Sequence, residues 1–175
     1  GGIVGRIDQG LAVISKCTNN GVLANLHKND NAWTAGKLSA NRTGGIIGTY
    51  GGVADFSTLD KSTSNITISE CTNTADLQCY RGLAGGIAGC LYNADVRNCS
   101  FTGKAVGASS AWDCGMGGIA GAVEYSTVSN CRVLSSFSGV SVATAGGIVA
   151  NLASASSISD SRYFGHISVG TAGRV

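Results

Sequence analysis

The chain has 175 residues, of which 43% are hydrophobic and only 13% are charged, against about 25% charged residues in an average domain. This composition excludes a disordered chain, and no apolar run approaches the roughly 18 residues that a transmembrane helix needs. The formal net charge is +2 and Lys and Arg form no cluster, so we expect neither nucleic acid nor an anionic membrane as a partner.

A glycine-rich string recurs five times along the chain. Each copy has two glycines, an isoleucine, a small or aliphatic residue, and then Gly or Ala. The copies span residues 1–5, 44–48, 85–89, 117–121 and 146–150. Successive copies are 43, 41, 32 and 29 residues apart, so the underlying period is about 28–30 residues, lengthened by insertions.

A second string follows each glycine string and consists of an aliphatic residue, two polar residues and Cys or Ser. Its copies span residues 14–17, 68–71, 96–99, 128–131 and 158–161. The aliphatic residue and the Cys should both face inward although they are three positions apart. We therefore expect the two polar residues between them to form a corner.

These repeats predict the fold class. Their pieces are short, rich in Ile and Val, and separated by Gly, Ser, Asn and Thr, and no segment keeps a helical period. Stacked coils would place like residues about 4.8 Å apart and build an inward ladder of isoleucines. The sequence predicts an all-β, right-handed parallel β-helix (β-solenoid) of about five coils, each with about three short strands and with loop insertions. We expect residues 1–175 to be a single repeat domain excerpted from a longer array.

The residues that follow the repeated isoleucines should point outward. They are Val4, Ile47, Ala88, Ala120 and Val149. They predict a flat, mildly apolar strip, which is typical of a packing surface for another domain or chain.

The two strings together resemble the GLUG motif: two glycines, an aliphatic residue, Val and Gly, then an Ile-Ser-Asn-Cys-like string and a glycine. The resemblance covers five consecutive units, although the first two carry long insertions and the fifth has Ser161 in place of Cys. Proteins with this motif include large bacterial surface and secreted proteins, some of them adhesin-like. The resemblance implies a bacterial surface or secreted location.

Three insertions, at residues 24–41, 51–65 and 107–114, hold the candidate binding residues. Loops inserted on a rigid solenoid commonly carry binding sites, and both tryptophans of the chain lie in them. An aromatic ring beside Asn and Asp suits a sugar. The predicted ligand-binding residues are His27, Asp30, Asn31, Trp33, Trp112 and Asp113. The alternative, that each Trp covers the side of the solenoid, stays open because large aromatic residues are mostly buried.

Catalysis and metal binding find no support in the spacing of residues. No two acids occupy one repeat position on adjacent coils, so no pair of catalytic carboxylates can be placed. The glycine strings lack the Asp of calcium-binding β-rolls, and no Cys-x-x-Cys pair suggests zinc. We predict no enzyme, no catalytic residue, no metal and no cofactor.

The seven cysteines divide into two sets. Cys17, Cys71, Cys99 and Cys131 share one repeat position and should form an inward column. We expect buried free thiols there, although stacked coils would also bring them within disulfide range. The second set, Cys79, Cys90 and Cys114, lies outside this column. Cys79 and Cys114 each precede a glycine pair on neighbouring coils, so a bridge between them is open beside the free form.

These observations favour a non-catalytic, adhesin-like β-solenoid module of a bacterial surface protein. We expect an extracellular or cell-surface location. The expected partners are a host glycan or surface protein and other domains of the same longer chain. Two alternatives stay open: a fragment of a carbohydrate-active β-helix enzyme, either a polysaccharide lyase or a glycoside hydrolase, and a purely structural spacer.

Overall fold

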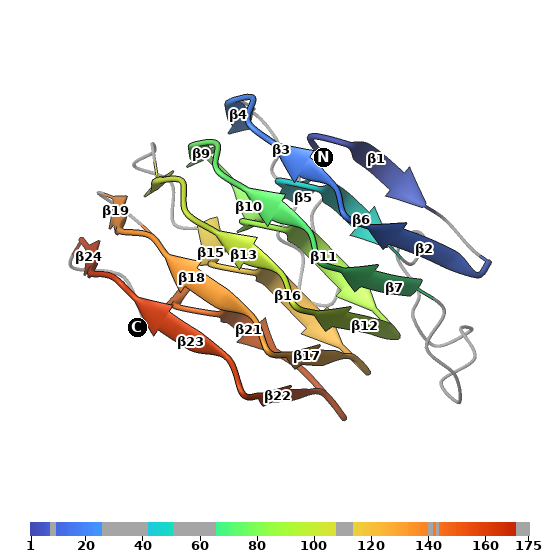
Figure 1. Cartoon of the computed structure of the whole chain (residues 1–175). Helices are drawn as coiled ribbons and strands as arrows, with labels where there is room; N and C mark the ends of the chain where they lie inside the picture. Colours follow the sequence, from blue (N-terminus) through green and yellow to red (C-terminus); the bar gives the residue numbers. More distant parts are fainter. Residues whose placement is uncertain are drawn as a thin grey trace.

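The computed structural model shows a stack of five coils whose strands lie side by side (Figure 1). The structure describes residues 1–7, 10–25, 42–50, 66–107, 114–139, 142 and 144–170. Within these ranges the chain forms 24 β-strands and no helix. Accordingly, no helix of the described part has the length and apolar character to span a membrane.

The strands form five parallel sheets, four with five strands and one with four, and successive strands of a coil belong to successive sheets. The first sheet contains β1 (Val4–Ile7), β6 (Ile47–Tyr50), β11 (Ala88–Tyr92), β16 (Ala120–Glu124) and β21 (Val149–Leu152). The second contains β2 (Ala12–Ser15), β7 (Ile66–Ser69), β12 (Ala94–Arg97), β17 (Thr127–Ser129) and β22 (Ser157–Ser159). The third contains β3 (Thr18–Asn19), β8 (Thr72–Asn73), β13 (Ser100–Phe101), β18 (Arg132–Leu134) and β23 (Arg162–Phe164). The fourth contains β4 (Leu23–Asn25), β9 (Leu77–Cys79), β14 (Ala105–Gly107), β19 (Phe137–Gly139) and β24 (Ile167–Val169). The fifth contains β5 (Arg42–Gly44), β10 (Gly82–Gly85), β15 (Cys114–Gly117) and β20 (Thr144–Gly146).

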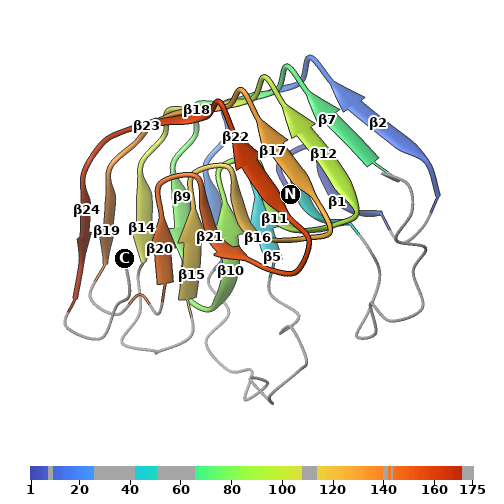
Figure 2. The same cartoon turned by 90° about the horizontal axis from the view of Figure 1, so that it is seen from below.

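The five sheets divide into an outer wall and an inner arch. The second, third and fourth sheets form the wall, and the fifth and first sheets lie between its two sides (Figure 2). The glycine string joins these two inner sheets, with a bend at its second and third residues. The tip of each arch therefore reaches the inner surface of the third sheet.

Glycine is required at the tip because no side chain would fit there. A Cβ on Gly85 would lie 2.0 Å from the carbonyl oxygen of Ala88. A Cβ on Gly86 would lie 2.2 Å from the carbonyl oxygen of Gly118 in the next coil. Such distances are below any real contact of a Cβ, so the paired glycines of the repeat follow from the close approach of the backbone.

The predicted isoleucine ladder is confirmed. Backbone N–H groups of Ile46, Ile87 and Ile119 each donate to the carbonyl of the isoleucine one coil on, at 2.9, 2.9 and 2.7 Å. These three side chains are fully buried in the main core, and Ile148 packs against it. The parallel β-helix class is therefore confirmed, while the right hand of the coil stays a prediction.

The prediction of an outward-facing apolar strip is wrong. Ile47, Ala88 and Ala120 are fully buried in the main core, and Val4 and Val149 pack against it. The bend at the arch tip places two consecutive residues inside, whereas a straight strand would alternate them. For the same reason each full coil has five short strands instead of the three predicted, because the glycine string is a pair of inner strands joined by a bend.

The predicted corner is confirmed by the backbone. Its second polar residue has a positive φ in all five coils, between 49° and 56°. The five residues are Lys16, Glu70, Asn98, Asn130 and Asp160. This left-handed conformation turns the chain sharply and lets residues three apart both face the core. Asn and Asp adopt it most readily among residues with a side chain, which explains three of the five choices.

Candidate functional site

The six predicted ligand-binding residues lie outside the described residues. They are His27, Asp30, Asn31, Trp33, Trp112 and Asp113. Their role stays a prediction.

The third sheet presents a face with two exposed columns of side chains. Strand alternation sends one residue of each coil inward and leaves its two neighbours outside. The first outer column contains Thr18, Thr72, Ser100, Arg132 and Arg162. The second outer column contains Asn20, Thr74, Thr102, Leu134 and Phe164. Because the coils stack in register, each column runs along the solenoid.

The first three coils of this face carry hydroxyl and amide groups. The hydroxyls of Thr72 and Ser100 lie 3.1 Å apart across two coils. The Thr74 hydroxyl donates to the Asn20 side-chain oxygen at 2.7 Å. These hydrogen bonds between coils hold the polar groups at fixed positions on a flat surface.

The last two coils carry arginines and apolar side chains in the same columns. Arg132 and Arg162 lie side by side on paired strands β18 and β23. The Arg132 guanidinium carbon lies 5.5 Å from the centre of the Phe164 ring. Phe164 is 52% exposed and Leu134 is 38% exposed. An exposed ring beside a cation is an unusual element of a solvated surface and marks this end of the face.

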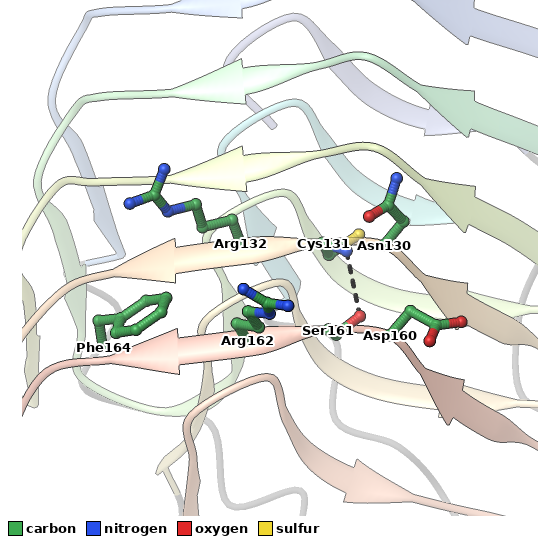
Figure 3. Close-up of a pocket in the computed structure, with 7 residues that line it drawn as sticks. All are labelled: Asn130, Cys131, Arg132, Asp160, Ser161, Arg162 and Phe164. Atoms are coloured by element: carbon green, nitrogen blue, oxygen red, sulfur yellow. Dashed lines mark hydrogen bonds between the residues drawn. The ribbon is translucent and has the colours of Figure 1, made fainter.

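An open hollow of about 620 Å³ lies at this end of the face (Figure 3). It is lined by Asn130, Cys131, Arg132, Asp160, Ser161, Arg162 and Phe164. Two hydrogen bonds between coils hold the lining. The Cys131 N–H donates to the Ser161 hydroxyl of the fifth coil at 3.1 Å, and the Asn130 amide donates to the Asn98 side-chain oxygen of the third coil at 2.6 Å. The residues that line the hollow are therefore linked to the neighbouring coils by hydrogen bonds.

The charge of this hollow is positive. In the part of the chain that the structure describes, neither Arg132 nor Arg162 forms an ion pair. Asp160 is the one carboxylate of the lining, and in Figure 3 it points away from both guanidinium groups. The nearby Asp95 carboxylate is held by Arg97 and by the Thr127 hydroxyl. The lining therefore contains two cations and one carboxylate, which points away from both.

Arg132, Arg162 and Phe164 are not among the predicted binding residues, although the repeat pattern contains a signal for the two arginines. Arg132 follows Cys131 and Arg162 follows Ser161, so both occupy the position directly after the corner string. Comparing that position across the five repeats would have shown two cations on consecutive coils. The aromatic partner, Phe164, lies two positions further along the same strand.

The cysteines are distributed as the repeat position predicts. Cys17, Cys71, Cys99 and Cys131 are free thiols, and the last three are buried. The Cys71 and Cys99 thiols donate back to Ser69 and Arg97 carbonyl oxygens at 3.2 and 3.3 Å. Hydrogen bonds with the Cys131 and Cys71 thiols, together with burial, raise the pKa of Cys99. The free-thiol form of the column is confirmed.

The second set of cysteines contains one disulfide. Cys79 at the end of β9 is bonded to Cys114 at the start of β15, with their Cα atoms 6.4 Å apart. Of the two forms that the sequence left open for this pair, the structure has the bridge. It ties the fourth sheet of one coil to the fifth sheet of the next. Within the described ranges, no group of three His, Cys, Asp or Glu residues has a geometry suited to a metal ion.

The architecture defines the class of the chain as a parallel β-solenoid repeat protein. The family model described as the GLUG motif matches residues 80–107. This segment includes the run from β10 to β14, which is one complete coil through all five sheets. The chain therefore carries the GLUG motif, which confirms the family that its repeats resemble. No curated protein and no solved structure matches the chain.

Proposed function

We propose that the chain is a non-catalytic, adhesin-like module of a bacterial surface protein that binds glycan on the outer face of its third sheet. The observation that carries the proposal is the exposed Phe164 ring, which lies in register with polar side chains of the earlier coils on a paired sheet.

Sugars present both apolar C–H surface and many hydroxyl groups. Phe164 and Leu134 offer apolar surface that is 52% and 38% exposed. Thr72, Ser100 and the neighbouring hydroxyl groups offer donors and acceptors in the same columns. Binding sites of this kind combine apolar contact with a few well-placed polar groups.

The rigidity of the face supports recognition of a long ligand. Each strand of the third sheet is paired in parallel with the strand of the next coil, from β3 to β23. Chemically similar groups therefore repeat about every 4.8 Å along the solenoid axis. A polysaccharide chain, which also repeats one ring at a time, would meet an ordered series of contacts with little loss of protein freedom.

The disulfide supports an extracellular location. Disulfides such as Cys79–Cys114 persist in secreted and surface proteins and are rare in reducing compartments. The GLUG motif points to the same location, because the proteins that this chain resembles are bacterial surface and secreted proteins. The predicted loop residues, Trp33 and Trp112 among them, lie outside the described residues and stay a separate prediction.

The proposal is tested by glycan-array binding of the wild-type chain and of Phe164→Ala. The variant should lose most of the signal, because the ring supplies apolar contact with the sugar. Leu152→Ala is the matched control, since Leu152 is an exposed apolar side chain (48%) on the first sheet of the same coil. Equal binding by wild type and Phe164→Ala would reject the site.

The two alternative functions give different outcomes. A carbohydrate-active enzyme would release reducing ends or unsaturated products from polysaccharides that the array identifies. A spacer would bind no glycan on the array and release no product. Binding without product release is the expected result.

A further inference from the structure

The two arginines of the hollow occupy one column on consecutive coils. Their strands are paired with Arg132 opposite Arg162, which places the two Cα atoms about one strand spacing, roughly 4.8 Å, apart. Like charges directly opposite each other on paired strands are unfavourable. The first three coils avoid this, since the same column holds Thr18, Thr72 and Ser100 there.

Among the described residues, no carboxylate is paired with either arginine. In the described ranges neither guanidinium has an ion-pair partner, and the Asp160 carboxylate of the lining points away from them. On the second sheet, Arg97 of β12 shows the opposite arrangement, because it is paired with Asp95. The exposed Arg97 thus has an ion-pair partner, whereas Arg132 and Arg162 have none among the described residues.

We propose that Arg132 and Arg162 bind an anionic substituent of the glycan, a carboxylate or a sulfate, while Phe164 contacts the adjoining sugar ring. This inference rests on the proposed function and adds the ligand class. A guanidinium donates two parallel hydrogen bonds to such a group. In Figure 3 the two guanidinium groups point to different sides, so these exposed side chains would turn towards each other to hold one anion between adjacent coils. The bound anion would also remove the repulsion between the two cations.

The position of the ring supports a sugar acid over a free anion. The Phe164 ring lies beside Arg132 and is exposed to the hollow, so a ligand anion on the arginines brings its carbon skeleton against the ring. A simple inorganic anion would leave that apolar surface unused. The hollow of about 620 Å³ is large enough for a sugar residue with its substituent.

The test uses isothermal titration with a pair of probes that differ only in charge: oligogalacturonate and its methyl ester. A sulfated oligosaccharide is titrated alongside to tell the two anionic groups apart. The wild-type chain should bind an acidic probe at least about tenfold more tightly than the ester, as expected for charge-assisted hydrogen bonds. The preference should weaken with added salt.

Arg132→Gln and Arg162→Gln should each remove most of this preference, and Arg162→Lys should keep more of it than Arg162→Gln because a cation remains. Arg97→Gln is the matched control: it removes the same charge from an exposed arginine outside the hollow and should keep the preference. Circular dichroism checks that the variants fold, which their exposed positions favour.

The outcomes separate this inference from the proposed function. If the acid and the ester bind equally, or if the arginine variants keep the preference, the anion site is rejected while glycan binding stands. If only neutral glycans of the array bind, the anion site is likewise rejected. If no glycan binds at all, the proposed function itself fails.

Discussion

Gly86 lies directly against the Phe101 ring. A Cβ built on Gly86 would come within 2.3 Å of the Phe101 Cγ, so the tip of the inner arch and the inward side chain of the third sheet are in contact. The same relationship recurs along the stack, between Gly45 and Asn73 and between Gly118 and Val133. The glycine string is thus the element that lets the arch reach the wall and close the core.

Substitution of Gly86 should destabilise the fold. Gly86→Ala places a methyl group 2.2 Å from the Gly118 carbonyl oxygen as well as against the Phe101 ring, and neither backbone nor ring base can move away. We expect a loss of about 3 kcal/mol in the free energy of unfolding, measured by denaturant titration. Gly5→Ala is the control, because nothing lies within 4 Å of its Cβ position. Equal stability of the two variants would contradict the packing described.

The corner at Glu70 offers a stabilising substitution. Glu70 has a φ of 55°, a conformation that costs about 1 kcal/mol or more for most residues and less for Asn. Glu70→Asn should therefore raise the free energy of unfolding by about 0.5–1 kcal/mol. Lys104→Asn, an exposed position without a positive φ, should give no such gain. A gain at both sites, or at neither, would show that the corner conformation is not the cause.

The disulfide should contribute measurably to stability. Cys79 and Cys114 are 35 residues apart, and closing a loop of that length in the unfolded chain stabilises a fold by about 3–4 kcal/mol in the chain-entropy model. The double variant Cys79→Ala with Cys114→Ala should lose about that amount, and mild reduction of the wild type should give a similar loss. A variant as stable as the oxidised wild type would argue against the bridge.

Alkaline pH should destabilise the fold through Cys90. Burial raises the pKa of Cys90 to about 11, from an ordinary value of 9.0. The unfolded thiol therefore ionises first, so stability that is complete below pH 9 is lost as the pH rises towards 11. The slope is about 1.4 kcal/mol per pH unit for one thiol.

Cys90→Ala isolates this contribution, because Ala122 holds the paired position in the next coil and shows that Ala fits. Between pH 9 and 11 the variant should lose about 2–3 kcal/mol less than the wild type, measured by denaturant titration at each pH. Parallel pH profiles for the two proteins would reject the assignment.

The repeated strings were enough to predict the register of the stack. Isoleucines such as Ile87 and corner cysteines such as Cys99 repeat at equivalent positions, and chemically matched residues in stacked coils must lie above one another. The aliphatic–polar–polar–Cys spacing likewise predicted a corner, because two inward residues three apart cannot belong to one straight strand. Local patterns of this kind therefore predict which residues face the core and where the chain turns.

The direction of Ala88 could not be predicted in this way, and the repeat position indicates only that Arg132 and Arg162 lie on consecutive coils. Alternation along a straight strand sends Ala88 outward, but the bend of the glycine string turns it into the core. The stacking of two coils is what places the Phe164 ring against Arg132 and pairs Arg132 with Arg162.

The sequence by itself determined that the chain is a stack of like coils, because residue type and period alone specify which positions must share an interior. Only the tertiary structure decided that the glycine string folds inward as an arch and that two cations meet beside an exposed ring. Both depend on contacts between backbones and side chains that are about 30 residues apart in the chain, from Arg132 to Arg162 for example, and no local pattern encodes the distance between such partners.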